Sequence, residues 1–220
     1  KYATDIMEFL ADHGADAVVI ACNTASSVAA DTLREKFDLP IIAMEPAVKP
    51  ALKTDERILV TATPVTLREE KLKNLIKRVG GEGRTDLLPL PKLVEFAEKE
   101  DFSSEALKRY FADVFSDCDT ASYSAVVLGC THFNYFKDSF REVFGEDITL
   151  VDGAFGTVRR VARLMGKEIA KKDSELYIKD TSTLTAGLKT GYYLSGRKVT
   201  DEDKLRRFIR LHNRLEEMRK

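Results

Sequence analysis

The sequence predicts an α/β fold made of two pseudo-symmetric lobes, each a parallel sheet with helices on both faces. Short β-branched runs alternate with helical stretches along the chain, as in βαβ units. The apolar runs are continuous, which is typical of strands buried on both faces. The segment DAVVIAC at 16–22 also returns as SAVVLGC at 124–130, and REKF at 34–37 returns as REVF at 141–144.

Each element is predicted from its local pattern. The first helix carries apolar residues on one face and ends at Gly14, a C-cap signal. Six strands are expected, at 16–21, 40–44, 57–63, 85–90, 125–129 and 148–152. Helices are expected at 25–37, 66–79, 91–98, 104–117, 133–144 and 154–165. The stretch 166–200 is expected to be loop with at most two short strands, ELYIKD and TGYYL, before an amphipathic helix from Asp201.

Composition limits the partners and the setting. The 220 residues include 35 basic and 36 acidic ones, so the net charge of −1 favours neither nucleic acid nor an anionic membrane as a partner. No apolar run approaches the roughly 18 residues of a membrane span. Three cysteines do not make a disulfide scaffold, and we therefore expect a reducing cytoplasm.

Two cysteines occupy equivalent places in the repeat. Cys22 and Cys130 each end a predicted strand just before a helix N-terminus. Ligands bind at the carboxyl ends of such strands, and the free N–H groups of a helix start favour an anion. We therefore expect both cysteines to favour the thiolate, with pKa values below about 8.5. Asn23, Thr24 and Thr131 would hold a small charged substrate. One thiol on each face of a substrate suits inversion at a carbon.

Further residues are weaker candidates. His132 is two residues beyond Cys130, where it would act as an acid or base or steer the protonation of the thiol. Glu95 is one glutamate among many on a charged helix. Cys118 has no such frame and is expected to be structural. A phosphatase-type loop, a CxxC pair and a nucleotide motif are absent, and the ligands for zinc are too few, so we predict no metal and no cofactor.

The chain resembles the glutamate racemases of the aspartate/glutamate racemase superfamily. The matching stretches are VVIACNTAS at 18–26, MEPAVKPA at 44–51, TATPVTLR at 61–68, LPKLVE at 90–95 and VVLGCTHF at 126–133. The motifs ACNTA and GCTH are shared across the superfamily, and the whole set in this order is specific to the glutamate enzymes. The resemblance implies racemisation of L- and D-glutamate without a cofactor, supplying D-glutamate for peptidoglycan synthesis, cell-wall biogenesis and cell shape.

The resemblance also implies roles for individual residues. Cys22 and Cys130 would be the two bases, and His132 and Glu95 would assist the second. The substrate would be held by Asn23, Thr24, Thr131 and, more weakly, Thr63 and Thr66. The active site would lie between a first lobe of residues 1–50 plus about 160–220 and a second lobe of residues 51–159. A homodimer is the expected assembly.

The sequence departs from the family pattern in two places. Asn134 stands where the family often has proline. The strand with an Asp-Ser-Gly turn that opens the family, and its later Pro-Tyr-Gly turn, do not occur in the 220 residues. That aspartate partners the first cysteine in the family, so we expect the N-terminal part of the first lobe to be missing and the parent protein to be the active form.

Two alternatives remain open at this point. One is a racemase of the same superfamily that acts on aspartate or a hydantoin, because only the side-chain end of the pocket would distinguish these substrates. The other is a non-catalytic protein that binds a small acid in the cleft. The paired cysteines argue against the second alternative, since a binding protein needs no thiol on each side of its ligand.

Overall fold

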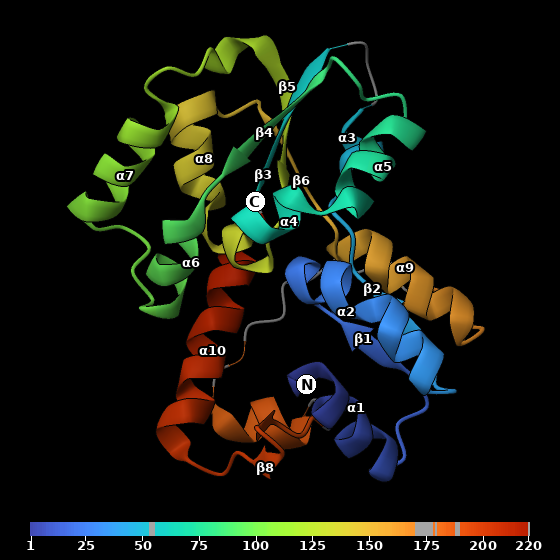
Figure 1. Ribbon diagram of the computed structural model, residues 1–220. Coiled ribbons are helices and arrows are strands. Elements are labelled where there is room, and N and C mark those ends of the chain that lie inside the picture. The colour runs from blue at the N-terminus through green and yellow to red at the C-terminus, as the bar shows by residue number, and fades with distance from the viewer. Residues whose placement is uncertain (53–55, 170–177, 179, 188–189, 220) are drawn as a thin grey trace. The chain divides into compact units, whose positions relative to one another are not determined.

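The computed structural model describes residues 1–52, 56–169, 178, 180–187 and 190–219. It divides into two compact units (Figure 1). One unit comprises residues 16–169, and the other comprises residues 1–15 with the described part of 170–220. Both cysteine motifs lie in the unit 16–169, which therefore holds the candidate site.

The unit 16–169 contains two parallel sheets. The smaller pairs β1 (Val18–Ile20) with β2 (Ile41–Ala43). The larger has the strand order β4-β3-β5-β6, with all neighbours parallel. Its strands are β3 (Arg57–Ala62), β4 (Thr85–Pro89), β5 (Tyr123–Leu128) and β6 (Thr149–Asp152). All six predicted strands and the parallel α/β fold class are confirmed.

Helices connect these strands, as the sequence predicted. The helices of this unit are α2 (Asn23–Lys36), α3 (Val48–Ala51), α4 (Pro64–Arg68), α5 (Glu70–Arg78), α6 (Pro91–Glu98), α7 (Glu105–Phe115), α8 (Lys137–Phe144) and α9 (Ala154–Leu164). Two short 3₁₀ segments, η1 (Thr120–Ser122) and η2 (Thr131–Phe136), flank β5.

Three details differ from the prediction. The helix predicted at 66–79 is two helices, because Glu69 between α4 and α5 has an extended backbone with ψ of 131°. The turn after Cys130 is the 3₁₀ segment η2, which passes into α8 at Lys137. The stretch 48–51 is the short helix α3, where only a domain boundary was expected.

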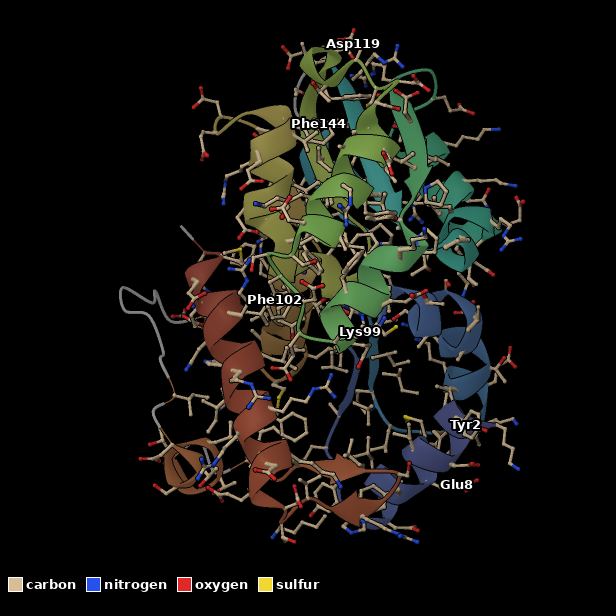
Figure 2. The ribbon with its side chains drawn as sticks, turned by 90° about the vertical axis from the view of Figure 1, so that its left-hand side faces the viewer. Tyr2, Glu8, Lys99, Phe102, Asp119 and Phe144 are labelled. Atoms are coloured by element: carbon tan, nitrogen blue, oxygen red, sulfur yellow. The ribbon has the colours of Figure 1, made fainter. Side chains whose placement is uncertain are left out.

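The four-stranded sheet is covered on both faces, which explains its continuous apolar runs. Ile58, Val60 and Ala62 pack into a cluster with α3, α4 and α5. Leu59 points to the other face, into a cluster rich in phenylalanine under α6, α7 and α8. Figure 2 draws the side chains of that aromatic layer, with Phe102 and Phe144 labelled. Burial of aromatic side chains on this scale is a main source of stability.

The strand order places a topological switch point in this sheet. The chain leaves β3 for β4 on one side and then returns past β3 to β5 on the other side. The crevice at the carboxyl ends of β3 and β5 is the place where open α/β sheets bind ligands. Thr63 follows β3 and Cys130 follows β5 at this edge.

The other unit is built from α1 (Tyr2–Asp12), the π-helical turn η3 (Thr183–Gly187), a hairpin of β7 (Tyr193–Leu194) with β8 (Arg197–Lys198), and α10 (Glu202–Glu217). Helix α1 ends before Gly14, which has a left-handed φ of 73°, as its C-cap signal predicted. Helix α10 starts where predicted, with the Asp201 side chain accepting the Lys204 N–H at 2.9 Å.

The remaining predictions for the tail have mixed outcomes. TGYYL contributes β7, whereas ELYIKD lies outside the described residues except for Ile178 and Asp180. The lobe boundaries at residues 51 and about 160 stay predictions, although β1 and β2 fall within 1–50 and β3 to β6 within 51–159. In the part of the chain that is described, no helix is long and apolar enough to cross a membrane.

Candidate active site

Cys22 lies at the start of α2, directly after β1. Its backbone is extended, with φ of −131°, and its Sγ accepts the Ala25 N–H at 3.5 Å, so the thiol caps the helix. The side chain is exposed. A helix N-terminus favours negative charge at its cap, and this position therefore suits a thiolate that must reach a substrate.

Ser26 fixes α2 to the strands beside it. Its hydroxyl donates to the Ile20 carbonyl at 3.1 Å and accepts the Met44 N–H at 3.0 Å, with the side chain 4% exposed. One hydroxyl thus joins the ends of both β1 and β2 to the helix that Cys22 caps. Buried hydrogen bonds of this kind hold a helix in one position because leaving them unpaired is costly.

Cys130 lies at the equivalent position after β5 but is buried, with 7% of its surface exposed. Burial raises the pKa of the Cys130 thiol to about 11. Hydrogen bonds from the backbone N–H groups of His132 and Phe133 lower this pKa, and a negative charge on Cys22 raises it further. The prediction that this cysteine has a lowered pKa is wrong, because desolvation outweighs the N–H groups of the turn. The electrostatic effect of Cys22 indicates that the two sulfurs lie near each other.

Gly129 sets the position of Cys130. Its N–H donates to the Thr61 carbonyl at 2.7 Å, and a Cβ at residue 129 would lie 2.7 Å from that same oxygen. Only glycine therefore fits where the chain leaves β5 and passes β3. This close approach brings the Cys130 turn against the turn after β3.

His132 joins Cys130 to a carboxylate. Its Nδ1 lies 3.7 Å from Cys130 Sγ, and its Nε2 lies 3.0 Å from Oε1 of Glu98. The side chains of His132 and Glu98 are 33% and 57% exposed, so the chain of contacts runs from a buried thiol toward the surface.

Glu95 does not occupy the place that the sequence suggested for it. Its side chain is exposed on α6. The pKa of Tyr110 is raised to about 12, mainly by burial, and the negative charge of Glu95 adds to that rise. The carboxylate against His132 is that of Glu98, one helical turn further along α6. The sequence analysis missed Glu98. Glu98 lies three residues after Glu95, and residues three apart share a helix face, so the spacing made both glutamates candidates for the carboxylate near Cys130.

Three predicted threonines come together across the two sheets. Thr24 Oγ1 lies 2.9 Å from both Thr63 Oγ1 and Thr66 Oγ1, and the latter two lie 3.1 Å apart. Thr24 belongs to α2, whereas Thr63 caps α4 and Thr66 lies within it. This triangle of hydroxyls ties the Cys22 helix to the turn beside Cys130. Each hydroxyl has one O–H to donate, and the three mutual hydrogen bonds use all three, so a carboxylate can be bound here only when a hydroxyl turns away from its neighbour.

Thr131 and Asn23 complete the predicted set. Thr131 is partly buried in the turn after Cys130, and its carbonyl accepts from Asn134 Nδ2 at 3.3 Å. Asn23 is 3% exposed, and its Oδ1 is buried with no hydrogen-bond partner among the described residues. An unsatisfied buried acceptor of this kind is uncommon in folded proteins and favours a site for a donor.

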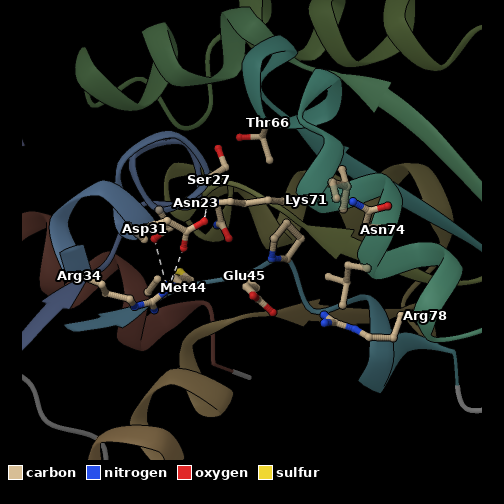
Figure 3. A pocket seen from close by; sticks show the side chains of 16 residues that line it. Asn23, Ser27, Asp31, Arg34, Met44, Glu45, Thr66, Lys71, Asn74 and Arg78 are labelled. Carbon is tan, nitrogen blue, oxygen red and sulfur yellow. Dashed lines mark hydrogen bonds and ion pairs between the residues drawn. The ribbon is translucent and has the colours of Figure 1, made fainter. Parts of the chain in front are cut away.

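Asn23 and Thr66 also line a hollow between α2 and α5 (Figure 3). Its volume is about 280 Å³, enough for a small molecule. On its wall Asp31 accepts hydrogen bonds from Arg34 at 3.2 Å and from Lys71 at 2.9 Å. In the described residues no group of three or more histidine, cysteine, aspartate or glutamate side chains is arranged to hold a metal ion.

Comparison with known proteins identifies the family of this chain. The family model for Asp/Glu/Hydantoin racemase matches residues 2–161, which include both cysteine motifs. The chain belongs to this racemase family. Glutamate racemase of Campylobacter curvus (strain 525.92) is 43% identical over 227 residues, a match that covers 99% of this chain and 80% of the relative.

Solved structures of racemases share the fold. The Escherichia coli glutamate racemase, solved in complex with L-glutamate and the activator UDP-MurNAc-ala, matches with a TM-score of 0.66 at 30% identity over 86% of this chain and 78% of its own. The Campylobacter jejuni subsp. jejuni enzyme matches with a TM-score of 0.70 over 96% of this chain and 79% of its own, and at 22% identity it supports the fold alone. The chain is thus an α/β amino-acid racemase by family and by fold.

Proposed function

We propose that this protein racemises glutamate, using Cys22 and Cys130 as two bases and no cofactor. The observation that carries the proposal is the placement of two thiols at equivalent strand ends, close enough for the charge of Cys22 to raise the pKa of Cys130. The similarity to curated glutamate racemases at about 43% identity supports glutamate as the substrate.

In the proposed reaction one proton is removed from the α-carbon and another is added to its opposite face. A thiolate on one side takes the α-proton, so that an S–H bond forms and the C–H electron pair stays on carbon. The thiol on the opposite side then donates its proton to the other face, which leaves the second sulfur as the thiolate. Because the thiol and thiolate have exchanged places, the reverse reaction starts from the product state.

The residues around the thiols have complementary roles in this proposal. When substrate binds, hydroxyls of Thr24, Thr63 and Thr66 turn from one another to donate to its carboxylate, and Asn23 Oδ1 accepts from the amino group. Thr131 provides a further polar contact beside Cys130. Donors at the carboxylate stabilise the negative charge that develops when the α-proton leaves.

The wider role follows from the product. We propose that the enzyme acts in the cytoplasm as a homodimer and supplies D-glutamate for peptidoglycan synthesis. Free cysteines at both base positions agree with a reducing compartment.

Circular dichroism of L-glutamate solutions tests the proposal. The protein is purified, and ellipticity is followed with L-glutamate, D-glutamate and L-aspartate. We expect the glutamate signals to decay to zero and the aspartate signal to persist. Decay with aspartate alone, or with neither amino acid, would overturn the assignment.

Serine variants test the two bases. We expect Cys22→Ser and Cys130→Ser each to lower kcat by three orders of magnitude or more, since a serine hydroxyl is far less acidic than a thiol, whereas Cys118→Ser leaves kcat within about twofold. Full activity in either base variant would rule out the two-thiol reaction.

A further inference from the structure

The turn that carries Cys130 is held by two kinds of contact. Phe133 and Phe136 are fully buried in the aromatic layer under α6, α7 and α8. Lys137, the residue at which η2 passes into α8, donates from Nζ to Oδ2 of Asp152 at 3.1 Å. The side chains of this ion pair are only 17% and 20% exposed. Because most of the pair is out of contact with water, salt screens it less than an exposed pair, and it is a second anchor for the turn.

Asp152 connects this turn to the end of β6. It is the last residue of that strand and lies opposite Leu128 of β5, two residues before Cys130. Its Oδ2 accepts from Lys137, and its Oδ1 accepts the Ala154 N–H at 2.8 Å. One carboxylate thus holds the starts of α8 and α9, the helices that come after β5 and β6.

The next residue, Gly153, brings the chain after β6 against the chain after β2. A Cβ at residue 153 would lie 2.7 Å from the Glu45 carbonyl oxygen and 3.0 Å from Met44 Cγ, two residues that Figure 3 labels. The hydroxyl and the N–H of Thr157 both donate to the Gly153 carbonyl, at 2.8 and 3.0 Å, and so hold it in place. The two segments can pass this closely because glycine has no side chain.

This close passage completes a series of contacts between the two thiols. Met44, next to Gly153, donates its N–H to the Ser26 hydroxyl on the helix that Cys22 caps. The residues of the series are, in order, Cys130, Lys137, Asp152, Gly153, Met44, Ser26 and Cys22. Within this series only the link between Lys137 and Asp152 depends on charged side chains. It can therefore be broken without changing a residue that the proposed reaction uses.

We propose that Lys137 and Asp152 are positioning residues whose ion pair sets the separation of the Cys22 and Cys130 thiols. Proton transfer to and from one carbon needs both sulfurs at defined distances, and a displacement of about 1 Å can lower a rate about a hundredfold. Neither member of the ion pair touches substrate in this scheme. The inference rests on the proposed function where it concerns rate, and on the contacts alone where it concerns the position of the turn.

Kinetics of variants that remove the charges test the effect on rate. Lys137→Gln should lower kcat by about tenfold to a hundredfold, with KM within about twofold because the substrate contacts stay in place. Adding Asp152→Asn should cause no further loss, because the pair is already broken and asparagine keeps an oxygen for the Ala154 N–H. Lys108→Gln is the matched control: its ion pair with Glu105 on α7 also spans 2.9 Å but is exposed, so kcat should not change.

Hydrogen exchange tests the position of the turn without turnover. Measured by mass spectrometry, amide exchange in Lys137→Gln should be severalfold faster in the segments 131–137, 153–157 and 25–27, the last at the start of α2. Exchange in β3 and β5 should not change. A general loss of stability would speed exchange in those strands as well, so the local pattern distinguishes positioning from stability.

The outcomes of the two tests separate this inference from the proposed function. The local exchange pattern in a protein that does not racemise glutamate would support the positioning role and refute the racemase. In an active protein, unchanged kcat and unchanged exchange in Lys137→Gln would overturn the inference and leave the racemase standing. A further loss of kcat on adding Asp152→Asn, an equal loss in Lys108→Gln, or faster exchange in β3 and β5 would also overturn it.

Discussion

Two cysteines with matching sequence frames have unlike surroundings. Cys22 is exposed and caps an α-helix, whereas Cys130 is buried at the start of a 3₁₀ turn and has a raised pKa. The symmetry of the motifs therefore does not extend to the burial of the two thiols. In a two-thiol racemase with these surroundings, the L-to-D and D-to-L reactions have different free-energy costs. Only one of the two directions uses Cys130 as the base and so requires its thiol to lose a proton first.

The raised pKa of Cys130 predicts how fast this residue reacts. Since the thiolate is the nucleophile, alkylation of Cys130 at pH 8 should be roughly 100-fold slower than that of an unstructured cysteine peptide. As the pH rises the thiolate fraction grows, so the rate should keep increasing up to about pH 11, the folded pKa. Rates are measured by mass spectrometry from pH 7 to pH 11.

The alkylation rate of Cys130 in the unfolded protein is the control for this prediction. In urea Cys130 should react with the pH dependence of an ordinary thiol, because unfolding removes the burial that raises its pKa. A rate for the folded protein that levels off by pH 9 would contradict the prediction.

At the scale of elements, the sheets explain why the strands were easier to predict than the turns. Continuous apolar runs belong to strands covered on both faces, and each such run formed a strand. The turn after Cys130 was harder because η2 and α8 together look like one helix in sequence. Its geometry depends on the contact of Gly129 with the β3 strand.

Two glycine-to-alanine substitutions test that contact with opposite expected signs. Gly129→Ala would place a Cβ 2.7 Å from the Thr61 carbonyl, so we expect it to lower the free energy of unfolding by about 1–3 kcal/mol. Gly156→Ala lies on α9, where a Cβ meets nothing within 4 Å, and should raise stability by up to about 1 kcal/mol. Urea denaturation measures both variants.

The comparison of the two variants isolates the cause. If Gly129→Ala were as stable as the original protein, the close passage of β5 and β3 would not be a constraint on this turn. A loss of stability in Gly156→Ala would instead indicate that other atoms occupy the space beside residue 156 on α9, where the structure has none within 4 Å of a Cβ.

At the scale of the whole molecule, residues 16–169 contain every predicted site residue, and the family match at 2–161 covers nearly the same part of the chain. Cys22, Cys130 and the three threonines come from three strand ends of two different sheets. Such a site exists only when both sheets are formed. Global unfolding and loss of the site should therefore be coupled.

The proposed chemistry predicts insensitivity to metal removal. Protons move only between the α-carbon and two thiols in this scheme, so no metal ion has a step to perform. Racemisation should stay within about twofold after dialysis against EDTA, measured by circular dichroism with L-glutamate. The control is the same dialysis followed by added Mg²⁺ or Zn²⁺. A large loss of activity that a divalent ion restores would contradict the proposal.

The sequence by itself determined the fold class, the six strands and the place of both cysteines after strand ends, because apolar periodicity and helix caps are local signals. It also identified the threonines that later proved to touch one another. Only the tertiary structure decided that Cys130 is buried, since desolvation depends on what packs around a side chain. The structure likewise decided that Glu98 rather than Glu95 meets His132, because two glutamates one turn apart on a helix look equivalent until the neighbouring segment is in place.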